Sequence, residues 1–321
     1  MRDHGGNLDW ARRQFGGSDW IDLSTGINRV PYPVGTVSAA AWTDLPTRAA
    51  TTGLLAAARI AYGTAAPMVA LSGAQGAIQA IPRLTRPGLA RVLAPTYNEH
   101  AAALRAAGWQ VEEVTSVAAL AGADLAVLVN PNNPGGQQVS RQDVLDLVRQ
   151  VGRLVVDESF MDATPDLSVA PQAGLAGLIV MRSFGKFYGL AGLRLGFALG
   201  STADITVLTE MAGPWPVSGA AIEIGTRALQ DRPWATATIA RLRKDVAACD
   251  AITERAGWQL QGGTALFRLY RVRDAVAAQA HLARAAIWAR VFPYTNDWVR
   301  LGIPGSSIEF SRLRDALYSQ L

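Results

Sequence analysis

The sequence predicts an α/β protein in which a large domain with a mostly parallel sheet is followed by a smaller α+β domain. Short apolar runs alternate with helical patterns from about residue 68 to residue 212, which implies a largely parallel sheet covered on both faces. The pattern changes after about Gly213. The chain has 321 residues, of which 50% are hydrophobic and 17% charged, so it can bury a large core.

Seven short apolar or β-branched runs are the expected strands, and helical patterns fill several of the gaps between them. The strands are expected at Met68–Leu71, Arg91–Ala94, Gln110–Val114, Leu125–Val129, Arg153–Val156, Leu178–Met181 and Leu195–Leu199. The helices are expected at Gln75–Leu84, Glu99–Ala107 and Arg141–Val151.

The remainder of the chain predicts the smaller domain. A long helical stretch runs roughly from Ser218 to Ala256 and carries many charged residues. Weaker strands and two further helices follow it, at Leu266–Leu269, Asp274–Ala285, Ile287–Arg290, Val299–Leu301 and Ser307–Leu321. We therefore expect a large domain over residues 41–212 and a small domain over residues 213–321, preceded by an N-terminal segment over residues 1–40.

Charge and composition exclude several classes of protein. The net charge is +4, but the basic residues are spread along the chain without a basic block, which argues against nucleic-acid binding. No apolar run is long enough to span a membrane, and the start lacks a secretory apolar region. Cys249 is the single cysteine, and His4, His100 and His281 are scattered. We expect a cytoplasmic protein with no disulfide framework and no metal site.

Lysine is rare in this chain. The thirty basic residues include only two lysines, Lys186 and Lys244, and an arginine bias this strong is typical of genome composition. Chemistry that needs a lysine amine therefore has two candidates. Lys186 lies in a glycine-rich loop between two expected strands, whereas Lys244 lies in a charged helical stretch and fits a solvated surface lysine better.

Ligands of open parallel sheets bind at the carboxyl ends of the strands. The residues Ser72–Gly76 follow the first strand and open a helix, so that their backbone N–H groups can approach an anion, although a tight turn gives the same pattern. Tyr97 follows the second strand, where its ring can stack on a planar cofactor or simply pack.

Two further strand ends carry polar residues. The run from Asn130 to Gly136 forms a turn by default, but a rigid turn can also present the amide of Asn133 to a phenolate oxygen. Asp157 comes directly after the strand at Arg153–Val156. It is either a helix N-cap or a carboxylate partner for a pyridinium nitrogen.

These residues together carry a family resemblance. The run Ser183-x-x-Lys186, followed by Arg194, resembles the Schiff-base segment of class I and II aminotransferases, which use pyridoxal 5′-phosphate (PLP). Asn133 and Asp157 precede it in the order of the family and at similar spacing. The resemblance covers nearly the whole chain and implies the PLP-dependent transferase fold of fold type I, with a mostly parallel seven-stranded sheet.

The resemblance also implies roles for single residues. Lys186 would bind the cofactor covalently and shuttle protons, and Asp157 would keep the pyridine nitrogen protonated. Tyr97 would stack on the ring as a third catalytic residue, and Asn133 would contact the 3′-oxygen as well as the substrate. The cofactor phosphate would be held by backbone N–H groups and side chains of Gly73, Ala74, Gln75, Ser183 and Arg194.

A narrower resemblance lies nearer the start of the chain. His4-Gly5-Gly6-Asn7 and the run from Trp20 to Asn28 look like the opening of the threonine-phosphate decarboxylases of cobalamin biosynthesis, which are similar to histidinol-phosphate aminotransferases. These enzymes convert L-threonine O-3-phosphate to (R)-1-amino-2-propanol O-2-phosphate and CO₂. The resemblance implies that residues 1–40 close over the active site. The implied substrate contacts are His4, Gly5, Gly6, Asn28 and Arg300, the last as a fork onto the α-carboxylate.

Two positions depart from the broader family. Phe160 stands where many relatives carry a tyrosine, so a phenol that could contact the 3′-oxygen is missing and Asn133 would act without it. Leu45-Pro46 stands where many relatives place a tyrosine that reaches the phosphate of the partner subunit. For His4, a disordered terminal residue is the alternative to a substrate contact.

Three functions stay open at this point. The first is decarboxylation of a phosphorylated amino acid, and the second is transamination of a phosphorylated amine such as histidinol phosphate. The third is a non-catalytic PLP-fold protein that senses or binds other cobalamin enzymes, against which Asp157, Lys186 and Arg300 count. The resemblance implies a homodimer, and contact with other enzymes of the cobalamin pathway is a further expectation.

Overall fold

The computed structural model describes residues 4–319, and the chain divides into two compact units. The sheet unit comprises Tyr32–Asn133 and Gln138–Trp234, and the terminal unit comprises the residues up to Pro31, the short segment Pro134–Gln137 and the residues from Ala235 onward. None of the helices among residues 4–319 is long and apolar enough to cross a membrane. The predicted closing of residues 1–40 over the active site stays a prediction.

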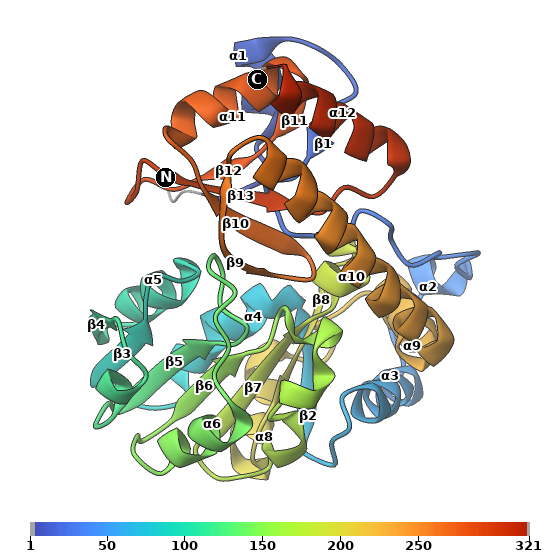
Figure 1. Cartoon of the computed structure of the whole chain (residues 1–321). Helices are drawn as coiled ribbons and strands as arrows, with labels where there is room; N and C mark the ends of the chain where they lie inside the picture. Colours follow the sequence, from blue (N-terminus) through green and yellow to red (C-terminus); the bar gives the residue numbers. More distant parts are fainter. Residues whose placement is uncertain (1–3, 320–321) are drawn as a thin grey trace. The chain divides into compact units, whose positions relative to one another are not determined.

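The sheet unit holds a seven-stranded sheet, which confirms the predicted fold class (Figure 1). The strand order is β2-β8-β7-β6-β5-β3-β4, and every neighbouring pair is parallel except those of β8, which runs antiparallel to β2 and to β7. The strands are β2 (Met68–Ser72), β3 (Leu89–Leu93), β4 (Gln110–Val114), β5 (Leu125–Val129), β6 (Leu154–Asp157), β7 (Leu178–Ser183) and β8 (Leu195–Leu199).

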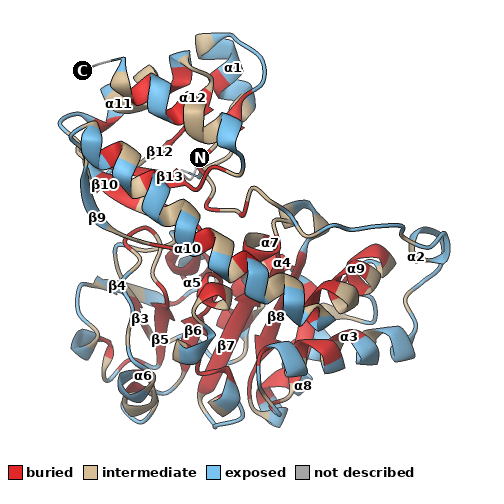
Figure 2. Cartoon of the chain, turned by 45° about the vertical axis from the view of Figure 1, so that its right-hand side comes forward, coloured by how far each residue is buried: buried red, intermediate tan, exposed pale blue. Residues whose placement is uncertain are grey.

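The central strands are covered on both faces. Every residue of β5, β6 and β8 is buried, whereas the edge strand β4 has no buried residue (Figure 2). A continuous apolar strand such as Leu-Ala-Val-Leu-Val in β5 needs this environment, because its side chains alternate between the two faces. On one face Val127 and Ile179 pack in a common core with Ile78, Leu104 and Leu208 from three helices.

Side-chain caps start four of the helices of the sheet unit. Thr47, Ser140, Ser201 and Ser218 each accept a hydrogen bond from the backbone N–H three residues later, which satisfies a donor that the helix leaves unpaired. The helices are α2 (Ala40–Thr43), α3 (Arg48–Ala61), α4 (Gly73–Ala80), α5 (Glu99–Ala106), α6 (Arg141–Val148), α7 (Phe184–Phe187), α8 (Thr202–Ala212) and α9 (Gly219–Gln230).

Two expected helices differ from the observed ones because of prolines. The helix expected over Gln75–Leu84 is α4, which ends at Ala80 and is followed by a 3₁₀ turn that contains Pro82. The long helix expected from Ser218 to Ala256 is broken at Asp231, just before Pro233. The carboxylate of Asp231 accepts a hydrogen bond from Trp234 N and so begins a new helix, α10 (Arg232–Arg255).

The terminal unit contains a four-stranded antiparallel sheet in the order β12-β13-β10-β9 and a two-stranded parallel sheet, β1-β11. The strand expected over Ile287–Arg290 belongs to both sheets, because the chain passes from β11 to β12 at Ala289. The elements are α1 (Leu8–Phe15), β1 (Ile21–Asp22), β9 (Gln259–Thr264), β10 (Phe267–Arg271), α11 (Ala275–Arg284), β11 (Ile287–Trp288), β12 (Arg290–Val291), β13 (Trp298–Gly302) and α12 (Ser307–Tyr318).

Residues from both ends of the chain build the terminal unit together. Strand β1 pairs with β11, and the rings of Trp10, Phe15 and Trp20 surround Trp288 with centroid distances of 5.6 to 6.4 Å. The guanidinium of Arg29 pairs with the carboxylate of Glu309, 280 residues further along the chain. The segment before Pro31 is therefore part of the core of this unit.

Candidate active site

The polar residues predicted to bind a cofactor meet at one edge of the seven-stranded sheet. Strands β3, β5, β6 and β7 are parallel, so the residues that follow or end them come to the same edge. Strand β8 runs the opposite way, and therefore Arg194, which precedes it, reaches that edge too. The predicted Asp157 is the last residue of β6 rather than the first residue of a loop.

A cavity of about 230 Å³ opens at this edge within the sheet unit. It brings together eight of the nine residues predicted to bind the cofactor, and these come from the ends of six different strands. Its lining is Ala74, Gln75, Ile78, Tyr97, Val129, Asn133, Asp157, Ser159, Phe160, Ser183, Lys186 and Arg194.

Lys186 lies on the short helix α7, directly after β7. Its side chain is partly buried, and Nζ lies 5.7 Å from the centroid of the Phe160 ring. An ammonium over an aromatic face is attracted by the ring, and the apolar surface removes part of its hydration. This environment differs from that of a solvated surface lysine. Lys244, by contrast, is exposed on α10.

Asp157 is a buried carboxylate that is held in its ionised form. Its Oδ2 lies 2.8 Å from Nε2 of His100, and its Oδ1 accepts hydrogen bonds from the backbone N and the hydroxyl of Ser159. Burial alone would raise the pKa of Asp157, but the hydrogen bond and charge of His100 and the two bonds from Ser159 outweigh it and lower the pKa. An ionised carboxylate in a cavity can hold a protonated ring nitrogen.

An anion cradle lies at the start of α4. Gly73 has a positive φ of 71°, which favours glycine, and a Cβ at this position would lie 2.5 Å from Nη2 of Arg194, so a side chain here would displace the guanidinium. The start of α4 carries no side-chain cap, and the helix dipole favours an anion there. Gly73 does not line the cavity. Its contribution to the cradle is the room that it leaves for the guanidinium of Arg194. With Ser183 in the same lining, these groups fit the phosphate of PLP.

The loop that carries Asn133 is braced at its base. Asn130 is fully buried, and its side-chain amide exchanges two hydrogen bonds with the backbone of Val139, at 2.9 and 3.0 Å. Asn132 accepts a hydrogen bond from the hydroxyl of Thr96 at 2.6 Å, in the loop that leads to Tyr97. The two loops therefore support each other, and both contribute a side chain to the cavity.

A buried ion network lies next to the lysine segment. Arg182, two positions before Phe184, donates to Glu158 and to Asp162 at 2.8 Å each, and its guanidinium lies 4.2 Å from the centroid of the Tyr62 ring. Burial raises the pKa of Glu158, although Arg182 opposes the shift. The network fixes the end of β7, from which Ser183 and Lys186 follow.

The residues predicted to bind the substrate lie mainly in the terminal unit. Arg300 is buried on β13, donates to the carbonyl of Ser24, and lies over the Phe267 ring. Burial, and next the charge of Arg290, lower the pKa of Arg300 to about 10, so it is a cation at neutral pH. Gly6 N donates to Ser24 Oγ at 2.7 Å, and a Cβ on Gly5 would lie 2.4 Å from Ser24 O.

Two of the predicted substrate residues stand apart from this cluster. His4 is exposed beside Gly5. Asn28 is buried, and its Oδ1 accepts hydrogen bonds from Val30 N and from Arg241 Nη2. The oxygen of Asn28 therefore holds the segment before Pro31 in place, and its contact with the substrate stays a prediction.

The comparison with protein families decides the assignment of the fold. Residues 47–317 match the family described as aminotransferase class I and II. The chain belongs to this aminotransferase family. A solved structure of similar fold is histidinol-phosphate aminotransferase from Sinorhizobium meliloti in complex with pyridoxal-5′-phosphate. It has a TM-score of 0.87 at 18% identity, over 98% of this chain and 95% of the other.

Two curated relatives are similar over nearly their whole length. A threonine-phosphate decarboxylase from Pseudomonas aeruginosa is 41% identical over 326 residues, which cover 99% of this chain and 97% of the relative. A threonine-phosphate decarboxylase from a Sinorhizobium species is 39% identical over 98% of this chain and 97% of the relative.

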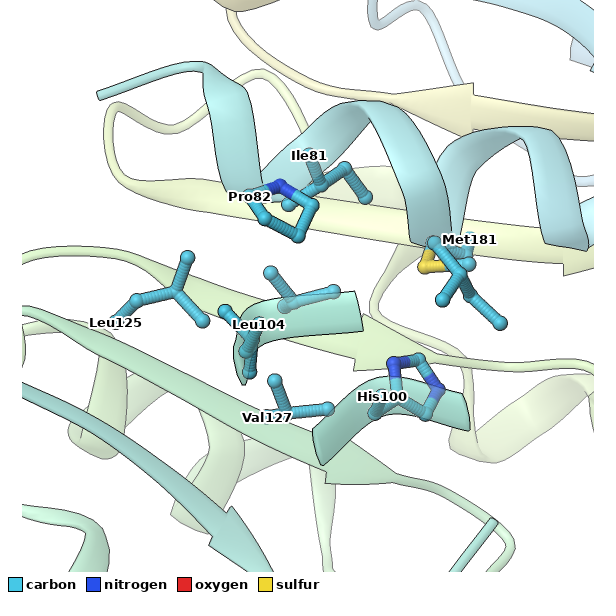
Figure 3. Close-up of a pocket in the computed structure, with 9 residues that line it drawn as sticks. Ile81, Pro82, His100, Leu104, Leu125, Val127 and Met181 are labelled. Carbon is cyan, nitrogen blue, oxygen red and sulfur yellow. The ribbon is translucent and has the colours of Figure 1, made fainter. Parts of the chain in front are cut away.

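His100 and Ser159 are the site residues that sequence reasoning missed. In the sequence His100 is one of three scattered histidines, but it follows Tyr97 by three residues and faces the same site from α5. Behind its ring lies a small cavity whose other lining residues, which include Leu104, Val127 and Met181, are apolar (Figure 3). Nothing polar in that lining can replace the hydrogen bond of His100 to Asp157.

Replacement of His100 by alanine tests this contact. In this variant burial still raises the pKa of Asp157, but His100 no longer lowers it. The pKa of Asp157 therefore rises, and the carboxylate becomes protonated at higher pH. We expect the acidic limb of the pH profile of kcat to move to higher pH, and kcat at neutral pH to fall about tenfold for the loss of a charge-assisted buried hydrogen bond. An unchanged acidic limb would contradict this role. Ser159→Ala, which keeps the backbone N–H, is expected to cause a smaller shift in the same direction.

Proposed function

We propose that this chain is a PLP-dependent threonine-phosphate decarboxylase, which converts L-threonine O-3-phosphate to (R)-1-amino-2-propanol O-2-phosphate and CO₂ for cobalamin biosynthesis. The observation that carries the proposal is the identity of 41% to such an enzyme over nearly the full length of both chains. An assay of CO₂ release from L-threonine O-3-phosphate, without any 2-oxo acid, tests it.

The sheet-unit cavity fits PLP. When bound, PLP supplies a conjugated ring that accepts the electron pair released when a bond to the substrate Cα breaks. In our proposal Lys186 holds the cofactor covalently through Nζ, and Asp157 keeps the ring nitrogen protonated. Tyr97 stacks on the ring and Asn133 donates to the 3′-oxygen, while the cradle at Gly73, Ser183 and Arg194 holds the phosphate.

Proton transfer follows from the position of Lys186. After CO₂ leaves, the substrate Cα must receive a proton, and Nζ of Lys186 would deliver it. The Phe160 ring beside Nζ keeps the amine from full hydration. Phe160 lacks the hydroxyl that a tyrosine would direct at the 3′-oxygen, which leaves Asn133 as the proposed contact.

Arg300 supplies the recognition of the substrate carboxylate. A buried guanidinium with a fork geometry suits a carboxylate, and Ser24 O already fixes its orientation. A decarboxylase must hold the Cα–carboxylate bond perpendicular to the plane of the cofactor ring, whereas an aminotransferase must hold the Cα–H bond there. We infer that Arg300, together with phosphate contacts from His4, Gly5, Gly6 and Asn28, selects the first orientation.

We also propose a homodimer. The sheet unit exposes large apolar side chains on two neighbouring segments, because Trp42 on α2 is 70% exposed and Trp215, just before α9, is 53% exposed. The segments touch, since a Cβ on Gly219 would lie 2.5 Å from Ala41 O. Exposed aromatic side chains of this kind are typical of interfaces.

Light scattering of the purified protein is expected to give twice the mass of one chain. The variant Trp42→Arg should shift the protein toward the monomer, because it places a charge in the proposed interface. Thr43→Arg, at the adjacent position, is the matched control for an added charge. A fully active wild-type monomer at working concentration would contradict the dimer.

The cellular location and further partners are also proposals. Cys249 is the single cysteine of the sequence and is buried, which is typical of a protein of a reducing compartment, and we infer a cytoplasmic enzyme. Contact with other enzymes of cobalamin biosynthesis remains an expectation from the resemblance.

A further inference from the structure

Two pairs of glycines bring backbone against backbone in the terminal unit. Gly135 and Gly136 follow the cofactor loop of Asn133 and belong to the same unit as β9. A Cβ on Gly136 would lie 2.2 Å from Gly263 O, and a Cβ on Gly262 would lie 2.2 Å from Gly135 O. Neither distance is compatible with a side chain, so the contact requires glycine on both sides. We call it the glycine contact.

The loop that carries Asn133 is therefore held at two ends. Its base is fixed in the sheet unit by the two hydrogen bonds between Asn130 and Val139. Its tip, Pro134–Gln137, belongs to the terminal unit. Asn133 is the last residue before the chain enters this tip. A displacement of Gly135 is transmitted to Asn133 through a single intervening residue, Pro134, whose φ is fixed.

The strand register extends the glycine contact to Arg300. Gly262 on β9 pairs with Leu269 on β10, and Leu269 pairs with Arg300 on β13, so that the three residues form one rung across the sheet. The register of β9 and β10 shifts directly after this rung, between Leu269 and Tyr270. The irregular strand β9 thus places Gly262 on the same rung as the backbone of Arg300.

We propose that the glycine contact positions Asn133 for the cofactor by tying its loop to the strand rung that carries Arg300. The proposal rests on the proposed function, because it assigns the cofactor to Asn133 and the substrate carboxylate to Arg300. Gly136 and Gly262 are positioning residues, since they act through Asn133. A substitution at either glycine displaces the tip of the loop, and with it Asn133, while every residue that lines the cavity keeps its identity.

The experiment compares Gly136→Ala and Gly262→Ala with a matched control. Gly136 has a φ of 74°, and Gly257, in the same unit, has a φ of 78° with nothing within 4 Å of its Cβ position. Gly257→Ala therefore carries the same backbone strain without the collision. Asn133→Ala is the reference for loss of the cofactor contact. For each PLP-loaded variant, the visible absorbance is titrated with pH in the absence of substrate, and KM and kcat are measured separately.

We expect Gly136→Ala and Gly262→Ala to move the midpoint of the titration to higher pH, in the direction of Asn133→Ala. The reason is that a lost donor destabilises the ionised 3′-oxygen. The value of kcat/KM for L-threonine O-3-phosphate should fall about 10-fold to 100-fold, the scale expected for a misplacement of about 1 Å. Gly257→Ala should keep the midpoint of the wild type.

Three results would overturn the proposal. The first is that Asn133→Ala shifts the midpoint of the titration while Gly136→Ala and Gly262→Ala both leave it unchanged. The second is that Asn133→Ala itself leaves the midpoint unchanged. The third is insoluble protein from both glycine variants beside a soluble Gly257→Ala, which would assign the contact to folding alone. Because the titration uses no substrate, an enzyme with the expected shifts but no CO₂ release would contradict the proposed reaction and leave the positioning role supported.

Discussion

Alanine at position 186 is expected to abolish the visible absorbance of the lysine-bound cofactor and to lower the rate of CO₂ release by at least about 10³-fold. The amine both holds the cofactor and moves the proton, and general acid–base catalysis alone contributes about 10²-fold to 10⁴-fold. Lys186 lies in the cavity with Asp157 and Asn133, next to the Phe160 ring. Absorbance spectra of the PLP-loaded protein and an assay of CO₂ release measure the two effects.

The chain provides its own control for this experiment. Lys244 is the other lysine of the sequence and is exposed on α10. Lys244→Ala is expected to keep both the absorbance and the activity. If the Lys186 variant retained the absorbance while the Lys244 variant lost it, the assignment of the cofactor lysine would be wrong.

L-Threonine O-3-phosphate is expected to release CO₂ without any 2-oxo acid, with kcat/KM about 10³-fold or more above that for L-threonine. Loss of the phosphate leaves donors of the enzyme without a partner, and a site built to bind a polar group rejects an analogue that lacks it by up to about 10⁵-fold. Binding energy from the remote phosphate also orients the carboxylate, so we expect kcat to fall together with affinity. Measurement of CO₂ release from both substrates gives the ratio.

Histidinol phosphate with 2-oxoglutarate is the control that separates the two reactions. Only transamination needs an amino acceptor. If this pair gave glutamate while L-threonine O-3-phosphate gave no CO₂, the decarboxylase assignment would be replaced by an aminotransferase, with Lys186, Asp157 and Asn133 in the same cofactor roles.

The strands of the sheet unit were predictable because burial leaves a simple pattern. Leu125–Val129 and Leu195–Leu199 match β5 and β8 residue for residue, since strands buried on both faces consist of unbroken apolar residues. Strand β9 was missed. Its sequence, Gln-Leu-Gln-Gly-Gly-Thr, is polar and glycine-rich, and it becomes a strand only because β10 pairs with it. Local sequence does not contain that pairing.

Two residues of the cavity illustrate what could be predicted from the sequence. Lys186 stands out because lysine is rare in this chain, and Asp157 stands out because it directly follows an expected strand. His100 was not predictable from its position in the sequence alone. Its partner Asp157 is 57 residues away, and the contact exists only because α5 packs over the sheet. The glycine contact was equally hidden, because Gly136 reads as an ordinary turn residue until Gly263 is known to face it. Long-range contacts of this kind need the fold.

The terminal unit combines residues from both ends of the chain, and this fixes the order in which its parts can fold during synthesis on the ribosome. The strands of the large sheet all lie between Met68 and Leu199, so they can pair while the remaining residues are still being added. Strand β1 has to wait for β11, and Ser24 has to wait for Arg300, which is 276 residues away. The Trp20 side chain, which is buried beside Trp288 in the folded unit, therefore emerges early but is buried late. A chain stopped before β11 would leave this ring exposed to solvent, where chaperones and proteases can bind it, even if its PLP cavity had already formed.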